Sequence, residues 1–351
     1  MNTFGKNLRL TTFGENHGPA IGGIIDGFPA GFKIDFDALQ EEIDKRKPGN
    51  SLLVTQRKES DKPEFLSGIN EKGITLGTPI GFIIRNTDNR GKDYSEVENK
   101  YRPNHADYTY DAKYGIRDHK GGGRASARET ANWVVAGALA QQWLNNKGIF
   151  IEAALTGVGN ISVTDFIIKE FCEKPFMNKI EVPSEIKSKM EEEILNAKSD
   201  GDSVGGVVTC LINGVPAALG DPVFDKLHAR MAQAMMSINA AKAFEYGIGF
   251  KSSEAFGSEV IDHFGYKPDQ GIFTQSNYSG GIQGGISNGM PIYFNVAFKP
   301  TPTILREIKT ITDKGEETIL KMKGRHDPCV AVRGVSVVKA MASLVIADFL
   351  L

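Results

Sequence analysis

The segment Ala127–Asn145, ARETANWVVAGALAQQWLN, decides the predicted architecture of this chain. Its apolar side chains lie around most of the helix surface rather than along one stripe. Val335–Leu350, near the end of the chain, has the same character. A helix that is apolar on most sides belongs at the centre of a domain. We therefore expect central helices that are covered by β-sheets.

The rest of the secondary structure is expected to be mixed, in an α+β fold. Arg85–Asn104 is predicted to be a long loop, and long loops in compact domains are often functional. Apolar residues at helical spacing predict three further helices at Asp35–Lys45, Ser184–Ala197 and Val223–Ser237. Runs of β-branched residues between turn residues predict strands at Leu8–Phe13, Ile21–Ile25, Ile80–Arg85, Ile149–Leu155, Val204–Ile212 and Ile292–Phe298.

The chain also shows signs of an internal duplication. Gly73–Phe82 and Gly285–Phe294 share the pattern G-I-x-x-G-x-P-I-x-F. Two further pairs follow the same order along the chain: Gly27–Ala30 with Gly214–Ala217, and Gly123-Arg124 with Gly324-Arg325. A true repeat predicts one domain over 1–351, with two halves at about 1–190 and 191–351 related by a pseudo-twofold axis. The ligand site would then form where the glycine loops meet. The alternative is chance recurrence of glycine–proline turns.

Composition limits the classes of function. The chain has 351 residues and a net charge of −2, so no overall basic field points to nucleic acid. Its three cysteines have no C-x-x-C spacing, which indicates a reduced, cytoplasmic protein without a disulfide framework or a zinc site. No apolar run reaches the roughly 18 residues needed to span a bilayer, and no signal peptide is expected.

Three glycine-dense segments carry the candidate chemistry. Glycine lets backbone N–H groups approach an anion, and arginine adds a planar charged fork. Together they predict one composite site for a multiply anionic ligand. The segments are Phe13–Gly18 (FGENHG), Gly121–Arg128 (GGGRASAR) and Gly324–Cys329 (GRHDPC), and the arginines near them are Arg102, Arg117, Arg124, Arg128, Arg325 and Arg333.

Two histidines and one aspartate are candidates for proton transfer. A histidine in a turn, such as His17, has an ordinary pKa that suits this role, although it could also be a surface residue. His105 follows Arg102, which could hold an anion beside it, or it could be a helix-capping neighbour of Asp107. Asp327 could be a general base or the ion-pair partner of Arg325.

The segment Gly121–Arg128 resembles a phosphate loop but lacks the Lys-Ser/Thr ending of a P-loop and the spacing of a dinucleotide fingerprint. A tight turn before a buried helix would account for its glycines equally well. Ser126 and Arg128 would lie at the N-terminal end of that helix, where the dipole favours an anion. The absent fingerprint argues against an NADPH:flavin oxidoreductase as the main activity.

Six segments together resemble the signature segments of the chorismate synthase family, in order and over Phe4–Leu350. They are the Phe13–Gly18, Gly121–Thr130 and Gly324–Cys329 segments, with Arg102–Tyr110, Met236–Ala240 and Lys299–Thr303. The resemblance implies a β-α-β sandwich with central helices between antiparallel sheets, assembled as a homotetramer. It implies anti-1,4-elimination of phosphate from 5-enolpyruvylshikimate 3-phosphate, giving chorismate, with reduced FMN and no net redox change.

The resemblance also implies roles for individual residues. His17 would protonate the departing phosphate, His105 would lie by the flavin ring, and Asp327 would assist removal of the C6 proton. Arg46, Arg102, Arg128 and Arg325 would hold substrate anions. The residues that would line FMN are Arg124, Ala125, Ser126, Asn239, Ala240, Gly284, Lys299, Pro300, Thr301, Pro302, Thr303 and Arg325.

Four positions depart from the family pattern. Asn16 and Ala125 stand where serine is usual, Leu52 where arginine is usual, and Lys339 where glutamate is usual. The change at Leu52 removes a cation that would contact substrate or a nicotinamide. A flavin- or anion-binding family member with weakened catalysis is therefore the alternative. NADPH is the candidate reductant, and an external reductant is the other option.

Overall fold

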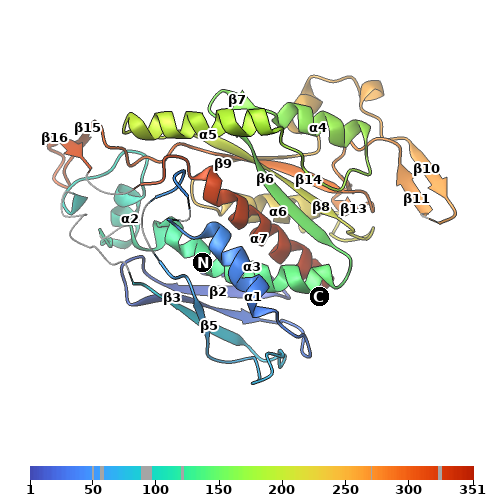
Figure 1. Cartoon of the computed structure of the whole chain (residues 1–351), viewed down its shortest axis with the longest axis horizontal. Helices are drawn as coiled ribbons and strands as arrows, with labels where there is room; N and C mark the ends of the chain where they lie inside the picture. The colour runs from blue at the N-terminus through green and yellow to red at the C-terminus, as the bar shows by residue number, and fades with distance from the viewer. Residues whose placement is uncertain (50, 56–58, 88–96, 120–121, 270, 323–325) are drawn as a thin grey trace.

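The computed structural model describes residues 1–49, 51–55, 59–87, 97–119, 122–269, 271–322 and 326–351. Two five-stranded antiparallel sheets enclose a layer of helices (Figure 1). One apolar core connects both sheets to the helices between them. The predicted α+β sandwich with central helices is confirmed.

The first sheet has the order β1-β2-β3-β5-β4. In β5, the side chains of Ile80, Phe82 and Ile84 are buried at alternate positions. This alternation is expected of an antiparallel sheet with one face on the core and one face in solvent. The strands are β1 (Thr3–Phe4), β2 (Arg9–Gly14), β3 (Ala20–Asp26), β4 (Pro63–Phe65) and β5 (Ile80–Arg85).

The second sheet has the order β7-β6-β8-β14-β9 and is covered on both faces. The helices α4 (Thr164–Glu173) and α5 (Ser184–Ser199) lie over its outer face (Figure 1). Coverage on both faces explains why nearly every residue of β8 and β14 is buried. The strands are β6 (Phe150–Val158), β7 (Ile161–Ser162), β8 (Gly206–Asn213), β9 (Ala241–Tyr246) and β14 (Ile292–Phe298).

The middle layer contains α1 (Phe36–Arg46), α3 (Thr130–Asn145), α6 (Leu227–Met236) and α7 (Ala331–Leu350). The helices α3 and α7 are packed directly against each other, which confirms their prediction as central helices. The helix α3 begins three residues later than predicted. Residues 127–129 instead form a 3₁₀ turn, and the Ser126 hydroxyl accepts a hydrogen bond from the backbone N–H of Arg128.

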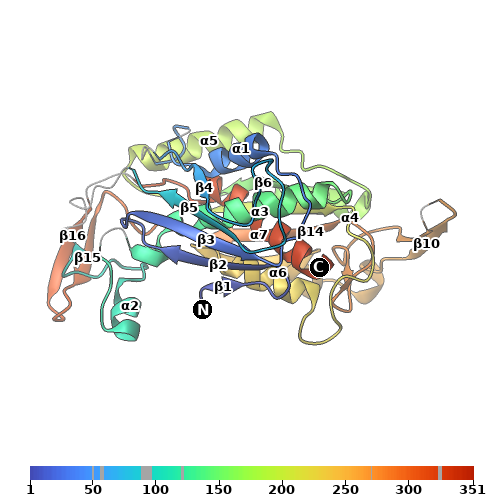
Figure 2. The same cartoon turned by 90° about the horizontal axis from the view of Figure 1, so that it is seen from below.

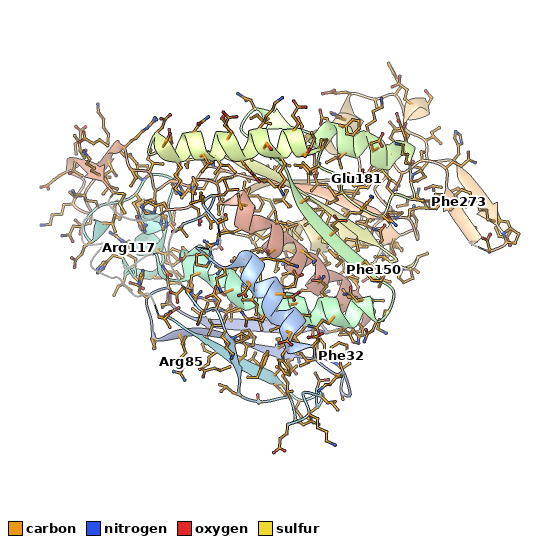
Figure 3. The ribbon with its side chains drawn as sticks, viewed as in Figure 1. Phe32, Arg85, Arg117, Phe150, Glu181 and Phe273 are labelled. Carbon is orange, nitrogen blue, oxygen red and sulfur yellow. The ribbon has the colours of Figure 1, made fainter. Side chains whose placement is uncertain are left out.

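Several helices and strands are not predicted by the sequence patterns. The helix α2 (Asp107–Tyr114) follows the predicted loop, of which residues 88–96 lie outside the described part of the chain. The hairpin β15 (Glu307–Ile311)–β16 (Glu317–Lys321) lies near α2, and β10 (Phe264–Lys267)–β11 (Gly271–Thr274) projects from the opposite end (Figure 2). A short hairpin joins β12 (Ile282–Gln283) and β13 (Ile286–Ser287). Arg117 and Phe273 mark these two ends of the molecule in Figure 3.

The predicted duplication stays a prediction, but the two sheets are built alike. The neighbours β2-β3-β5 of the first sheet have counterparts in β6-β8-β14 of the second. Because β6 belongs to the second sheet, a boundary drawn by sheet membership falls near residue 148 rather than near residue 190. None of the helices in the described ranges is both long enough and apolar enough to cross a bilayer.

Candidate functional site

A cavity of about 400 Å³ lies where the N-terminal ends of α3 and α7 come together. Its described wall residues come from distant parts of the chain, including the three glycine-dense segments. The N-terminal end of a helix carries partial positive charge, so two such ends favour an anionic ligand. Each of the three glycine-dense segments contributes at least one described residue to the cavity wall, and the composite ligand site predicted there stays a prediction.

The structure brings most of the predicted site residues to this cavity. Those that line it are Arg102, His105, Ala125, Ser126, Arg128, Asn239, Ala240, Lys299, Thr301, Pro302, Thr303 and Asp327. The described lining residues do not include His17, Arg46, Arg124, Gly284 or Pro300. His17 nonetheless follows Asn16, which does line the cavity. Arg325 lies outside the described residues, so its predicted role stays a prediction.

Arg128 is held by a buried carboxylate and by an amide. Its Nη1 donates to Asp61 Oδ1, and its Nε donates to Asn86 Oδ1 over 3.0 Å. Its Nη2 is buried and has no hydrogen-bond partner among the described residues. A buried donor without a partner is costly, so this nitrogen is a candidate to bind an anion in the cavity.

Arg46 lies behind Arg128 and shares the same carboxylate. Its Nη1 donates to Asp61 Oδ2 over 3.1 Å, its Nη2 to the Ala127 carbonyl, and its Nε to the Thr130 hydroxyl. Burial alone would raise the pKa of Asp61, but Arg46 and Arg128 hold that pKa below its usual value. The geometry therefore gives Arg46 an internal role, and its predicted contact with substrate stays a prediction.

His105 stands beside a second buried ion pair. Asp107 accepts hydrogen bonds from Arg102 Nε and Nη2 over 2.8 and 2.7 Å, and the Nδ1 atom of His105 lies 3.2 Å from Asp107 Oδ1. Burial lowers the pKa of His105. An imidazole that is neutral near neutral pH can donate or accept one proton at the cavity wall.

Asp327 has partners for both of its oxygens. Its Oδ1 accepts from the Thr55 backbone N–H over 2.9 Å, and its Oδ2 accepts from Arg333 Nη1 over 2.7 Å. Arg333 also donates from Nε to the Arg46 carbonyl. Asp327 therefore lies at the cavity with an orientation fixed from two sides, and its described cationic partner is Arg333.

Three other predicted positions are not among the described residues that line the cavity. Arg124 turns toward β2 and donates to Glu129 Oε2 and Thr12 Oγ1, both over 2.8 Å. Gly284 lies in the turn between β12 and β13, where a Cβ atom added to it would meet no other atom within 4 Å. The side chain of Leu52 is largely exposed and does not pack into the core.

Two neighbouring segments of the cavity wall, joined by a hydrogen bond from Lys299 N to the Ala240 carbonyl, carry polar atoms that have no described partner. Asn239 Oδ1 and Thr301 Oγ1 are buried and have no hydrogen-bond partner among the described residues. Asn239 uses its Nδ2 to donate to the Ala125 carbonyl over 2.9 Å. Such atoms suit a ligand that has its own donors and acceptors, as the edge of a flavin ring does.

Asp61, Asn86 and Thr55 also belong to the site, and no sequence pattern indicates them. Thr55 acts through its backbone N–H, which leaves no mark in the sequence. Asp61 and Asn86 act through side chains that Arg128 contacts from far along the chain. Asp61 has a φ of +47°, which is uncommon for a residue other than glycine, but this conformation is not visible in the sequence.

The family model for chorismate synthase matches residues 8–351 of this chain. The chain belongs to the chorismate synthase family. A chorismate synthase from Christiangramia forsetii is 54% identical, over 100% of this chain and 97% of its own length. A chorismate synthase from Bacteroides fragilis is 52% identical, over 100% and 98%.

A solved structure described as a crystal structure of chorismate synthase has a TM-score of 0.78 and 31% identity, over 99% of this chain and 92% of that chain. Membership of the chorismate synthase family confirms the resemblance found in the signature segments. It makes the chain a lyase family member, and it implies a flavin cofactor.

Proposed function

We propose that this protein converts 5-enolpyruvylshikimate 3-phosphate to chorismate and phosphate at the cavity between the ends of α3 and α7. The observation that carries the proposal is the pairing, in one cavity, of an anion-binding side with proton-transfer groups. Arg128 Nη2 is a buried donor without a described partner, and Asp327 and His105 line the same cavity. An anionic substrate that must both lose a proton and release phosphate needs these two features together.

The reaction breaks the C6–H bond and the C3–O bond to phosphate, and forms the second ring double bond. The proton from C6 would pass to Asp327, whose carboxylate is held by Thr55 and Arg333. A proton for the departing phosphate would come from His17, beside Asn16 at the cavity. The atoms balance, because one proton leaves the ring and one reaches the phosphate.

Positive groups around the cavity would bind the phosphate and the carboxylates of the substrate. Arg102 and Arg128 line the cavity, and each is oriented by a buried aspartate. Such preorganised charges stabilise the developing negative charge on the phosphate without further reorganisation. Holding the substrate in one orientation supplies a further part of the barrier reduction.

We infer that reduced FMN is the cofactor, because the unpartnered atoms of Asn239 and Thr301 fit a flavin edge. The residues that would hold it are Ala125, Ser126, Asn239, Ala240 and Lys299–Thr303. When bound, reduced flavin supplies electron density that assists cleavage of the C3–O bond to phosphate. NADPH as the reductant, a homotetramer and a cytoplasmic location belong to the same proposal.

The test is an anaerobic assay with the phosphorylated enolpyruvyl substrate and photoreduced FMN. Chorismate should appear in step with released phosphate, and neither should appear without FMN. Parallel assays with oxidised FMN, with and without NADPH, would separate self-reduction from dependence on an external reductant. Flavin binding without any turnover would instead support the alternative of a family member with weakened catalysis.

A further inference from the structure

Asn86 connects two parts of the site that are far apart in the sequence. It follows directly after the last residue of β5, Arg85, which Figure 3 labels on the first sheet. Its side-chain Nδ2 donates to the carbonyls of Glu15 and Gly18, over 3.1 and 2.8 Å. Its Oδ1 accepts from Arg128 Nε over 3.0 Å. One amide therefore serves three partners.

The first two partners define the turn that carries Asn16 and His17. Gly18 N donates to the Glu15 carbonyl over 3.0 Å, which closes the turn, and the backbone N–H of Asn86 donates to the Pro19 carbonyl just beyond it. Asn16 in this turn is 4% exposed and lines the cavity. The Asn86 amide thus fixes the position of the turn relative to the cavity.

The third partner is the cavity arginine. Arg128 has Asp61 on Nη1 and Asn86 on Nε, so two fixed acceptors determine the plane of its guanidinium. That plane decides where the unpartnered Nη2 points. The amide orientation is itself determined, because a reversed amide would place Oδ1 against two carbonyls and Nδ2 against a cation.

We propose that Asn86 is a positioning residue that holds the Asn16–His17 turn in register with Arg128. This inference rests on the proposed function, in which His17 donates a proton to the departing phosphate and Arg128 binds the same phosphate. Both must meet the same leaving group, so their relative position controls the rate. Only an amide provides two donor hydrogens on one side and an acceptor on the other.

The test is a double-mutant cycle with Asn86→Ala, His17→Ala and the double variant, each assayed with substrate and reduced FMN. Asn86→Ala should lower kcat by about 10²-fold, because a misplacement of about 1 Å in a catalytic group costs that much. In the His17→Ala background, Asn86→Ala should lower kcat by less than about threefold, since the two act as a unit. Losses that multiply in the double variant would overturn the inference.

A second readout does not depend on turnover. Hydrogen exchange in the cofactor-free protein, followed by mass spectrometry of a peptide over residues 13–20, reports on the turn directly. Asn86→Ala and the isosteric Asn86→Asp should both accelerate exchange of the Gly18 amide, because both lose the two donors. Unchanged exchange in a folded variant would show that Asn86 does not hold the turn.

Asn213→Ala is the matched control. Asn213 also donates from its side chain to a distant carbonyl, that of Asn178 over 3.2 Å, but it lies at the end of β8. The Asn213→Ala variant should leave both kcat and hydrogen exchange at residues 13–20 unchanged. If His17→Ala alone keeps full turnover, the proposed acid is wrong, and the exchange measurement still decides whether Asn86 holds the turn.

Discussion

Gly137 of α3 lies directly against Ala340 of α7. A Cβ atom built on Gly137 would lie 2.5 Å from the Ala340 Cα and 2.7 Å from its carbonyl oxygen. Both atoms belong to the backbone of a buried helix, so neither can move without shifting α7. This contact sets the distance between the two central helices, whose N-terminal ends border the cavity.

Gly137→Ala should therefore destabilise the protein. Alanine has the higher helix propensity by about 1 kcal/mol, which alone would stabilise α3. Overpacking of a core commonly costs about 1–3 kcal/mol, and here the clash is with backbone, so we expect the free energy of unfolding to fall. Urea denaturation followed by circular dichroism measures it.

Gly334→Ala in α7 is the comparison. Its added Cβ would meet the edge of the Phe298 ring at 3.0 Å, and a ring can shift more easily than a helix backbone. Gly334→Ala should therefore lower the free energy of unfolding by less than Gly137→Ala does. A Gly137→Ala variant as stable as the original protein would mean that the helices separate without penalty.

Replacing either candidate histidine should reduce turnover strongly. His17→Ala and His105→Ala should each lower kcat by about 10²–10⁴-fold, the usual contribution of a general acid or base. Phosphate release under anaerobic conditions measures the effect. Full activity in both variants would remove the histidines from the proposed mechanism.

His105 should also make the stability of the fold depend on pH. Burial lowers its pKa, as do the charges of Arg102 and Lys299, although Asp107 nearby opposes them. Between the lowered folded pKa and the unfolded value of about 6.5, the unfolded chain binds more protons. The stability that this group contributes is therefore complete above about pH 6.5 and falls as the pH drops toward the folded pKa.

His105→Gln should remove this part of the pH dependence. Denaturation midpoints between pH 8 and pH 5 should fall less steeply for the variant than for the original protein. His263→Gln, at an exposed histidine, serves as the control and should follow the original curve. Identical curves for His105→Gln and the original protein would contradict the lowered pKa.

Lysine at Arg102 or Arg128 should weaken substrate binding although the charge is kept. Each guanidinium uses more than one nitrogen at once: Arg102 on Asp107, and Arg128 on Asp61 and Asn86. An ammonium group cannot reproduce that fork. Loss of one charge-assisted hydrogen bond, worth about 1.5–3 kcal/mol, should raise KM about tenfold or more. An unchanged KM in both variants would count against direct anion contacts.

The amino-acid sequence predicts the central helices because a helix that is apolar all round is stable only when other elements cover every side of it. Its signature segments also predict that Arg102, Arg128 and Asp327 belong to one site. It could not separate an arginine that faces a ligand from one that supports another side chain. Arg46 and Arg128 have the same charge and share Asp61, and only the fold decides which of them lines the cavity.

Other features depend on contacts that no local pattern records. The sequence marks Arg333 only by its charge, and its hydrogen bond to Asp327 depends on the path of the chain into the first turn of α7. Helix α2 has only a weak apolar stripe, and its buried residue, Asp107, is a charged group that is ion-paired with Arg102. Propensity alone therefore gives little signal there.

Leu52→Arg is predicted to strengthen ligand binding. The Leu52 side chain is 69% exposed, so a longer side chain can be accommodated there without disturbing the core. Its backbone carbonyl accepts a hydrogen bond from Lys198 Nζ over 2.7 Å, and this contact does not depend on the side chain. A new charge-assisted hydrogen bond from the introduced guanidinium to an anionic ligand, worth about 1.5–3 kcal/mol, would tighten binding about tenfold or more at low salt.

Titration of substrate and of NADPH against both proteins decides where this loop faces. The gain should shrink as salt rises, because exposed charges are screened beyond about 10 Å at 0.1 M ionic strength. Leu66→Arg is the control, since Leu66 is similarly exposed at 67% but follows β4 on the first sheet, so it changes net charge equally. Affinities that rise only in the Leu52→Arg variant would place this side chain at the ligand. Equal affinities in all three proteins, for each ligand, would show that the side chain at this position points away from the site.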